Sequence, residues 1–292
     1  MRIAIFGNLY QAEKSIQAKH LFNALSKYNA EILICEEFYR FLHTVMKIEP
    51  RYSKLITDNN FSADMALSLG GDGTFLKTAE RVGNKHIPIL GINTGRLGFL
   101  ADVAENEIDE AVAELFNGDY RIEERSLLQL KADALPVKFW PFALNEAAIL
   151  KRDSSSMITI RTYLNDVFLN TYQADGLIVS TPTGSTGYSL SVGGPILVPQ
   201  APNFVIAPVA PHSLNVRPLV FNDQDTIRMQ IESRSNNFLV SLDGRSAMMS
   251  TNHELIICKA PFTTSIVKRN NHVFIDTLRD KLMWGADKRY NI

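Results

Sequence analysis

Residues 65–82 read MALSLGGDGTFLKTAERV, a short apolar run that ends in glycines around one aspartate and continues with a helical pattern. The apolar run predicts a buried strand, and Phe75, Ala79 and Val82 recur at the spacing of one helix face. A strand that turns at glycines into a helix is typical of an open α/β sheet, which binds ligands beyond the carboxyl ends of its strands. Asp72 therefore lies where a bound molecule is expected.

The turn Gly70–Thr74 has the residue types of a phosphate site. Glycines let the backbone approach a ligand closely, and free N–H groups at a helix start attract phosphate oxygens. Because a carboxylate repels phosphate, Asp72 is useful there only if it holds a metal, accepts a hydrogen bond from a hydroxyl or takes its proton. The turn equally fits a plain helix start capped by Asp72. It matches neither a P-loop nor Gly-x-Gly-x-x-Gly, since Leu76 replaces the last glycine.

The same alternation of strands and helices extends over the first 120 or so residues. A helix is expected to start at Asn106 as its N-cap and to end before Gly118. Residues 1–122 are therefore predicted to form an α/β domain, Rossmann-like, with a parallel sheet. The other predicted strands are residues 2–6, 31–35 and 87–92.

From about residue 122 the sequence pattern changes to short runs of Val, Ile, Leu, Thr and Tyr between turn residues, without a helical period. Asn165-Asp166 and Asp243-Gly244 are predicted to be hairpin turns. Residues 123–271 are accordingly expected to form a β-rich sandwich domain. The last segment, about 272–292, has a helical pattern and is expected to pack back on the first domain.

Composition excludes several classes of protein. Hydrophobic residues make up 46% of the 292 residues and charged residues 21%, as in a globular protein with substantial cores. Thirty basic against 31 acidic residues argue against a nucleic-acid partner. Cys35 and Cys258 have no zinc or disulfide spacing, and the uncharged stretch 176–216 is broken too often by Gly and Pro to span a membrane. We expect a cytoplasmic location, with no membrane partner.

Asn145-Glu146 is a second polar signal, because it interrupts an apolar stretch that runs from Trp140 to Leu150. A carboxamide beside a carboxylate offers donors and acceptors that suit a ribose diol. The pair also fits the exposed end of a strand.

The third signal is residues 175–195, DGLIVSTPTGSTGYSLSVGGP. Small hydroxyl side chains on a glycine-rich loop can bond phosphates or sugars without adding charge, and Tyr188 offers a flat face to a base. A long connection without such a role is the alternative, although structureless loops of this length are uncommon. The order Gly-Ser-Thr-Gly disfavours the Gly-x-Ser-x-Gly elbow of hydrolases.

Together the three segments resemble the NAD kinases in order and separation, over nearly the whole chain. Residues 91–100, 211–214, 217–219 and 281–289 add to the resemblance. The third segment is specific to this family, whereas Gly-Gly-Asp-Gly-Thr is shared with diacylglycerol and sphingosine kinases and is similar to a phosphofructokinase turn. Gln173 and Arg245 stand where arginine and glutamine are common, and Gly187 replaces a frequent alanine.

The resemblance implies that Asp72 is the catalytic carboxylate. The sequence itself shows no cluster of metal-ligating residues, so no residue is predicted as a metal ligand. Lys77 is implied as a phosphate contact, although a solvated helix lysine is equally expected at its position. The residues implied to bind NAD or ATP are Asp72, Gly73, Lys77, Asn145, Glu146, Asp175, Thr183, Thr186, Gly187, Tyr188, Ser189, Leu190 and Ser191.

The implied reaction moves the γ-phosphoryl of ATP, or a phosphoryl of polyphosphate, to the adenosine 2′-hydroxyl of NAD, with Mg²⁺ or another divalent metal on the ATP phosphates. The resemblance also implies a homodimer or homotetramer assembled through the β-rich domain, with Asp175 and Tyr188 near a neighbour's site. The alternatives are a lipid or sugar kinase of the same superfamily and a non-catalytic dinucleotide sensor. A lipid kinase predicts a basic amphipathic stretch, and the sequence has none.

Overall fold

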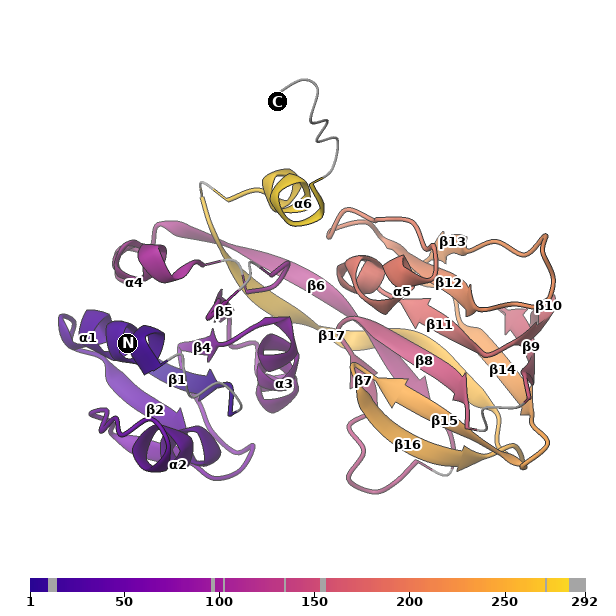
Figure 1. The fold of residues 1–292 in the computed structure, drawn as a ribbon, viewed down its shortest axis with the longest axis horizontal. Helices are drawn as coiled ribbons and strands as arrows, with labels where there is room; N and C mark the ends of the chain where they lie inside the picture. The colour runs from indigo at the N-terminus through magenta and orange to yellow at the C-terminus, as the bar shows by residue number, and fades with distance from the viewer. Residues whose placement is uncertain are drawn as a thin grey trace. The chain divides into compact units, whose positions relative to one another are not determined.

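The computed structural model describes residues 1–9, 15–95, 98–101, 103–133, 135–152, 156–270 and 272–283. The chain divides into two compact units (Figure 1). The first unit is Met1–Glu124 with Thr264–Ile292, and the second is Arg125–Thr263. Within the described ranges, no helix is both long enough and apolar enough to cross a membrane.

A parallel sheet forms the centre of the first unit. Its strands lie in the order β3 (Lys54–Ile56), β2 (Glu31–Cys35), β1 (Arg2–Gly7), β4 (Met65–Leu69), β5 (Ile89–Ile92) and β17 (Leu255–Arg269), the last through its residues from Thr264 onward. The strand order reverses between β1 and β4, where open α/β sheets bind ligands. Gly7 is paired with Leu69, so both strands end level at this point. The predicted parallel α/β sheet is confirmed.

Helices bury their apolar sides against this sheet because apolar residues recur every three or four positions. Side chains of α1, α2 and α4 share one core with alternate residues of the strands. Helix α3 lies against β5, where Gly91 leaves room for the Phe75 ring. The helices that the structure describes in this unit are α1 (Ser15–Ser26), α2 (Glu36–Thr44), α3 (Asp72–Val82), the short η2 (Glu105–Glu107), α4 (Ile108–Asn117) and α6 (Phe274–Leu282).

Two helices of this unit begin or end at other residues than the sequence predicts, or lie partly outside the described residues. Asn106 is not the N-cap of α4: it lies within η2, and the Glu107 carboxylate accepts the Ala104 N–H at 2.9 Å instead. The prediction was wrong because the helical turns begin earlier: Glu107, three residues after Ala104, accepts the Ala104 N–H and stabilises a turn that already includes Asn106. Of the helix expected over 272–292, α6 is observed, and residues 284–292 lie outside the described residues.

Two antiparallel sheets build the second unit. One sheet has the order β13 (Leu219–Asn222), β12 (Asn203–Val209), β11 (Gly176–Ser180), β8 (Glu146–Lys151), β15 (Asn237–Leu242) and β16 (Arg245–Ser250). The other has the order β10 (Val167–Ala174), β9 (Ile158–Leu164), β14 (Ile227–Glu232) and β17, with β6 (Tyr120–Lys131) on β17 and β7 (Phe142–Ala143) on β6. The helical turns η3 (Thr183–Thr186) and α5 (Tyr188–Ser191) follow β11.

The two sheets of the second unit enclose one apolar core, which confirms the predicted sandwich. Strand β14 buries every second residue toward this core, as a strand with one covered face does. Both predicted hairpin turns are also confirmed. Asn165-Asp166 and Asp243-Gly244 have positive φ angles, from 47° to 82°, which suit two-residue turns between antiparallel strands.

Candidate active-site clusters

The first cluster surrounds Asp72, the first residue of α3. Its carboxylate accepts three consecutive backbone N–H groups: Oδ2 from Phe99 at 3.0 Å, and Oδ1 from Leu100 and Ala101 at 3.1 Å each. The Nζ atom of Lys281, on α6, lies 3.4 Å from Oδ2. The Asp72 side chain is 29% exposed. A partly open carboxylate at the end of β4 is thus held in a fixed orientation.

Two glycines allow the 99–101 loop to lie this close to Asp72, because they have no side chain. A Cβ atom on Gly98 would lie 2.0 Å from Asp72 Oδ1, and one on Gly91 would lie 2.7 Å from the Ala101 Cα atom. Buried Asn93 supports the same loop, donating from Nδ2 to the Ala101 carbonyl at 3.3 Å. The loop's amides therefore reach Asp72 only because Gly98 and Gly91 lack a Cβ atom. Arg96 and Leu97 of this segment lie outside the described residues.

We expect Gly98→Ala to displace Asp72 or the loop that holds it. A shift of about 1 Å at a catalytic group costs up to roughly 10²-fold in rate, and overpacking costs about 1–3 kcal/mol in the free energy of unfolding. Steady-state kinetics measure the loss in rate, and urea unfolding measures the loss in the free energy of unfolding. Gly73→Ala is the control for stability, because its Cβ atom would meet nothing within 4 Å. Equal unfolding free energies for the two variants would contradict the prediction.

The second cluster lies in the other unit, around Asn145 and Glu146 at the start of β8. Asp243 holds this segment: its Oδ2 accepts the Leu144 N–H at 2.7 Å, and its Oδ1 accepts those of Asn145 at 2.8 Å and Glu146 at 3.1 Å. The Asp243 side chain is only 4% exposed. A carboxylate buried this deeply is tolerated because backbone donors fill its lone pairs.

The hydroxyl- and glycine-rich segment packs directly on Asn145. Thr181 Oγ1 donates to the Leu144 carbonyl at 2.5 Å and accepts the Gly184 N–H at 3.1 Å. A Cβ atom on Gly184 would lie 2.1 Å from the Asn145 carbonyl oxygen. The Glu146 carboxylate accepts the backbone N–H of Tyr188. The structure therefore brings together two segments that the sequence separates by about 40 residues.

Several polar atoms of this cluster lack a partner among the residues that the structure describes. Asn145 Oδ1, Glu146 Oε2 and Ser189 Oγ are buried and make no hydrogen bond within those residues. Buried polar atoms are nearly always paired in native proteins, so unpaired ones indicate a place for a ligand or water. Tyr188, next to them, leaves 38% of its surface exposed. The cluster thus combines unused hydrogen-bonding atoms with an accessible aromatic ring.

Glu146 has a strongly raised pKa. Burial, and then the negative charge of Asp243, raise its pKa from 4.5 to about 7, while the Tyr188 N–H opposes this shift. Burial likewise raises the pKa of Asp243, against the three backbone donors and Arg245. Near neutral pH, Glu146 therefore exchanges between a hydrogen-bond acceptor and a neutral group that can also donate.

This shift predicts how stability depends on pH. Because the folded pKa lies above the unfolded value, ionisation of Glu146 removes stability as pH rises from about 4.5 to about 7, and the loss then stays constant. Glu146→Gln removes this cost, so we expect the variant to gain up to about 3 kcal/mol on wild type between pH 4.5 and 8. Urea unfolding at several pH values measures the gain. Glu232→Gln, at an exposed position, is the control and should show no such gain. The prediction would be contradicted if the free energies of unfolding of Glu146→Gln and wild type changed with pH in parallel.

The other predicted residues are spread more widely. Asp175 lies at the far end of β11 from Glu146, about 16 Å away by strand geometry, and its Oδ1 pairs with Lys151 Nζ at 2.7 Å. Lys77 is exposed, a little over one helical turn beyond Asp72. Within the loop, the Thr186 hydroxyl donates to the Thr183 carbonyl and the Ser191 hydroxyl donates to that of Tyr188. The remaining ones, Gly73, Gly187 and Leu190, lie on the same segments as their neighbours.

Gln173 and Arg245, the two residues that differ from those common in NAD kinases, have different surroundings. Arg245 donates from Nη2 to the Phe142 carbonyl at 2.7 Å, and its guanidinium lies 4.8 Å from the centre of the Trp140 ring. Gln173 lies on β10, where its carbonyl accepts the His212 N–H at 2.8 Å. Arg245 thus supports the strand that leads to Asn145.

Two residues of these clusters had no assigned role in the sequence. Asp243 was expected only as a hairpin turn, and Lys281 only as part of a family motif. No local pattern distinguishes them, because their partners lie 97 to 209 residues away. In the described ranges, no group of three or more His, Cys, Asp or Glu residues is placed to hold a metal ion.

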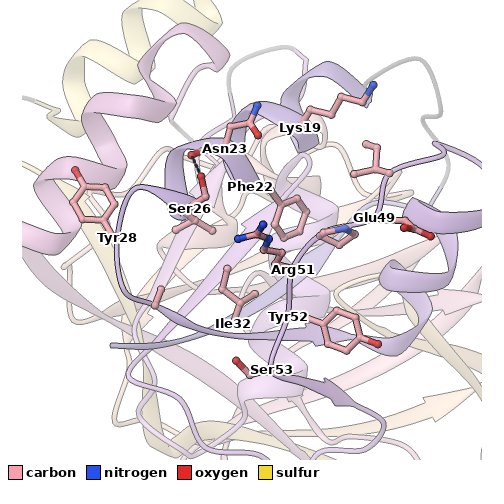
Figure 2. Close-up of a pocket in the computed structure, with 14 residues that line it drawn as sticks. Lys19, Phe22, Asn23, Ser26, Tyr28, Ile32, Glu49, Arg51, Tyr52 and Ser53 are labelled. Atoms are coloured by element: carbon pink, nitrogen blue, oxygen red, sulfur yellow. Dashed lines mark hydrogen bonds between the residues drawn. The ribbon is translucent and has the colours of Figure 1, made fainter.

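A cavity of about 640 Å³ lies elsewhere in the first unit, between α1 and residues 48–53 (Figure 2). Its lining includes Lys19, Phe22, Arg51 and Tyr52, and none of the predicted site residues. This cavity therefore does not coincide with either cluster of predicted site residues.

Two protein-family models together match most of the chain. The model of the ATP-NAD kinase N-terminal domain matches residues 3–120, and that of the ATP-NAD kinase C-terminal domain matches residues 144–269. The chain belongs to the NAD kinase family. The resemblance inferred from the motifs is thereby confirmed, and the matches give no support to the lipid-kinase, sugar-kinase or sensor alternatives.

Individual NAD kinases match over the full length. An NAD kinase of Bacteroides fragilis is 58% identical over 289 residues, covering 99% of this chain and 100% of the relative. One from Christiangramia forsetii is 44% identical, with the same coverage. An NAD kinase from Archaeoglobus fulgidus, solved in complex with ATP, has a TM-score of 0.75 at 26% identity, covering 97% of this chain and 99% of that one.

Yeast NADH kinase, solved in complex with NADH, superimposes with a TM-score of 0.89 over 99% of this chain and 89% of that one. Its sequence identity is 21%, so this likeness concerns the fold alone.

Proposed function

We propose that the chain transfers the γ-phosphoryl group of ATP to the adenosine 2′-hydroxyl of NAD and so produces NADP. The observation that supports this most directly is the Asp72 carboxylate, oriented by three backbone amides at the end of β4. A fixed, partly exposed carboxylate at a topological switch point can orient a hydroxyl for attack and accept its proton. The family matches supply the substrates that this chemistry would use.

The second cluster would bind the dinucleotide. The unpaired Asn145 and Glu146 oxygens can accept hydrogen bonds from ribose hydroxyls, and the Tyr188 ring can stack on a base. Asp243 would keep the Asn145-Glu146 backbone in place for this contact. Glycines 184 and 187 would let the loop approach both residues closely.

In the reaction, the 2′-oxygen forms a bond to the γ-phosphorus while the bond between that phosphorus and the β,γ-bridging oxygen breaks, and ADP leaves. The transition state of phosphoryl transfer is loose, so positioning and charge neutralisation contribute more than early removal of the proton. Asp72 would orient the hydroxyl, take its proton late and release it to solvent. Mg²⁺ or another divalent metal would arrive on the ATP phosphates and neutralise part of their charge. Lys77 would be a further phosphate contact.

The assembly and location remain part of the proposal. We infer a homodimer or homotetramer in which Asp175 serves a neighbouring copy's site, because it lies at the opposite end of β11 from Glu146 in its own chain. Light scattering on the purified chain measures the assembly. A cytoplasmic location is also proposed, where the substrates and a reducing environment for Cys35 and Cys258 are available.

The function is tested with purified protein, NAD, ATP and Mg²⁺. NADP is measured with an NADP-specific dehydrogenase, and mass spectrometry with ³¹P NMR identifies the 2′-phosphate. Parallel reactions replace ATP with polyphosphate, or NAD with diacylglycerol. NADP formation supports the proposal. NAD binding without NADP from either donor would favour a sensor, and phosphorylated lipid would favour a lipid kinase.

A further inference from the structure

Lys281 makes the only side-chain contact to the Asp72 carboxylate among the residues that the structure describes. Its Nζ atom lies 3.4 Å from Asp72 Oδ2 and 4.7 Å from the centre of the Phe99 ring. Lys281 is near the end of α6, and 31% of its side chain is exposed. The ammonium thus reaches Asp72 from a helix 209 residues away along the chain.

The Lys281 contact takes the last acceptor position of the Asp72 carboxylate. A carboxylate has about four lone-pair sites. Leu100 and Ala101 occupy those of Oδ1, whereas Phe99 and Lys281 occupy those of Oδ2. All four sites are filled, so a hydroxyl can bond to Asp72 only if one donor leaves.

Lys281 is the donor that can leave most easily. Its contact is the longest of the four, and it comes from a flexible, partly exposed side chain. The three amides belong to a loop that Gly98 and Asn93 hold against Asp72. The Phe99 ring can keep a released ammonium nearby through cation–π attraction.

We propose that Lys281 occupies the hydroxyl-binding position of Asp72 until substrate displaces it, and that the released ammonium then binds the phosphoryl group being transferred. The proposal rests on the proposed function, because it assigns the 2′-hydroxyl to Asp72. Lys281 forms no covalent bond and keeps its proton throughout. It pairs first with the carboxylate and then with the phosphate oxygens, whose negative charge an ammonium stabilises during transfer.

The test compares Lys281→Met, Lys281→Arg and Arg279→Met. Methionine keeps an unbranched apolar chain beside Phe99 but removes the charge. Arg279 is on the same helix, pairs with Asp276 and is 66% exposed, so its variant controls for loss of a cation from α6. The measurements are kcat and KM for ATP and NAD, the Kd for NAD without ATP by calorimetry, and thermal unfolding.

We expect Lys281→Met to lower kcat by roughly 10²-fold, because one stabilising donor at a transition state is lost. Its Kd for NAD should be equal to or lower than that of wild type, because no ammonium competes for Asp72. Lys281→Arg should retain most of the rate, and Arg279→Met all of it. Unfolding temperatures should remain close to wild type, since the contact is exposed.

Wild-type kcat in Lys281→Met would overturn the proposal, as would a lower kcat accompanied by an equal weakening of NAD binding. If the wild-type protein makes NADP, either of these results for Lys281→Met refutes only the role of Lys281. A wild-type protein that makes no NADP refutes the proposed function, and the role of Lys281 with it.

Discussion

Asp72→Asn is expected to lower the rate of NADP formation by about 10²–10⁴-fold, the usual contribution of a positioned proton acceptor. Asparagine has nearly the same size but only one acceptor oxygen, and its amide would face backbone N–H groups of the 99–101 loop. The 2′-hydroxyl then loses the group that orients it and takes its proton. Initial rates with saturating NAD and ATP measure the loss.

The matched control is Asp64→Asn, because the Asp64 carboxylate also accepts a backbone N–H, that of Arg2 at 2.7 Å. Asp64 lies in the same unit but outside the predicted site, so its variant should keep the wild-type rate. Calorimetry should show that Asp72→Asn still binds NAD within a few-fold of wild type. A rate within tenfold of wild type would contradict the role given to Asp72.

Asp243→Asn should lower stability and also weaken NAD binding. Asparagine can adopt the positive φ of 49° at this turn, so the change isolates the carboxylate. One amide oxygen cannot accept the three N–H groups of residues 144–146, and a buried donor without an acceptor costs about 1–3 kcal/mol. Because burial raises the pKa of Asp243, removing its charge offsets part of this cost. We expect a net loss of about 1–3 kcal/mol in the free energy of unfolding and a several-fold rise in the KM for NAD.

Urea unfolding and NAD titrations separate the two effects. Asp223→Asn is the control, because Asp223 is equally buried in the same unit but pairs with the side chains of Lys259 and Gln224. It should destabilise the protein without changing the KM for NAD in the folded protein. If both variants raise that KM alike, Asp243 stabilises the unit without positioning Asn145-Glu146.

Local patterns predicted much of the fold. The strand, glycine turn and helix over residues 65–82, and the hairpins at 165–166 and 243–244, all formed as expected. These features depend on interactions between residues a few positions apart, such as the φ angle of a turn or the apolar face of a helix. Asn106 was misassigned because the first helical turn begins at Glu105, where the Glu107 carboxylate accepts the Ala104 N–H.

The candidate site was predicted less completely. The sequence predicted Asp72, Asn145, Glu146 and the hydroxyl-rich loop as site residues, because polar residues that interrupt apolar strands are visible in the sequence alone. Residue patterns alone gave no sign that Asp175 lies apart from these residues, although the register of β11 places it at the opposite end of the strand from Glu146. Strand pairing is decided across the sheet and leaves no mark on either segment alone.

The sequence by itself therefore determined the family, the alternation of strands and helices, and the residue types available for phosphoryl transfer. Only the tertiary structure decided that Asp72 is held by the amides of residues 99–101 and reached by Lys281. It alone showed Asp243 holding residues 144–146 from about 100 positions away. The physical reason is that backbone N–H groups are identical in every residue, so only folding decides which carboxylate they meet.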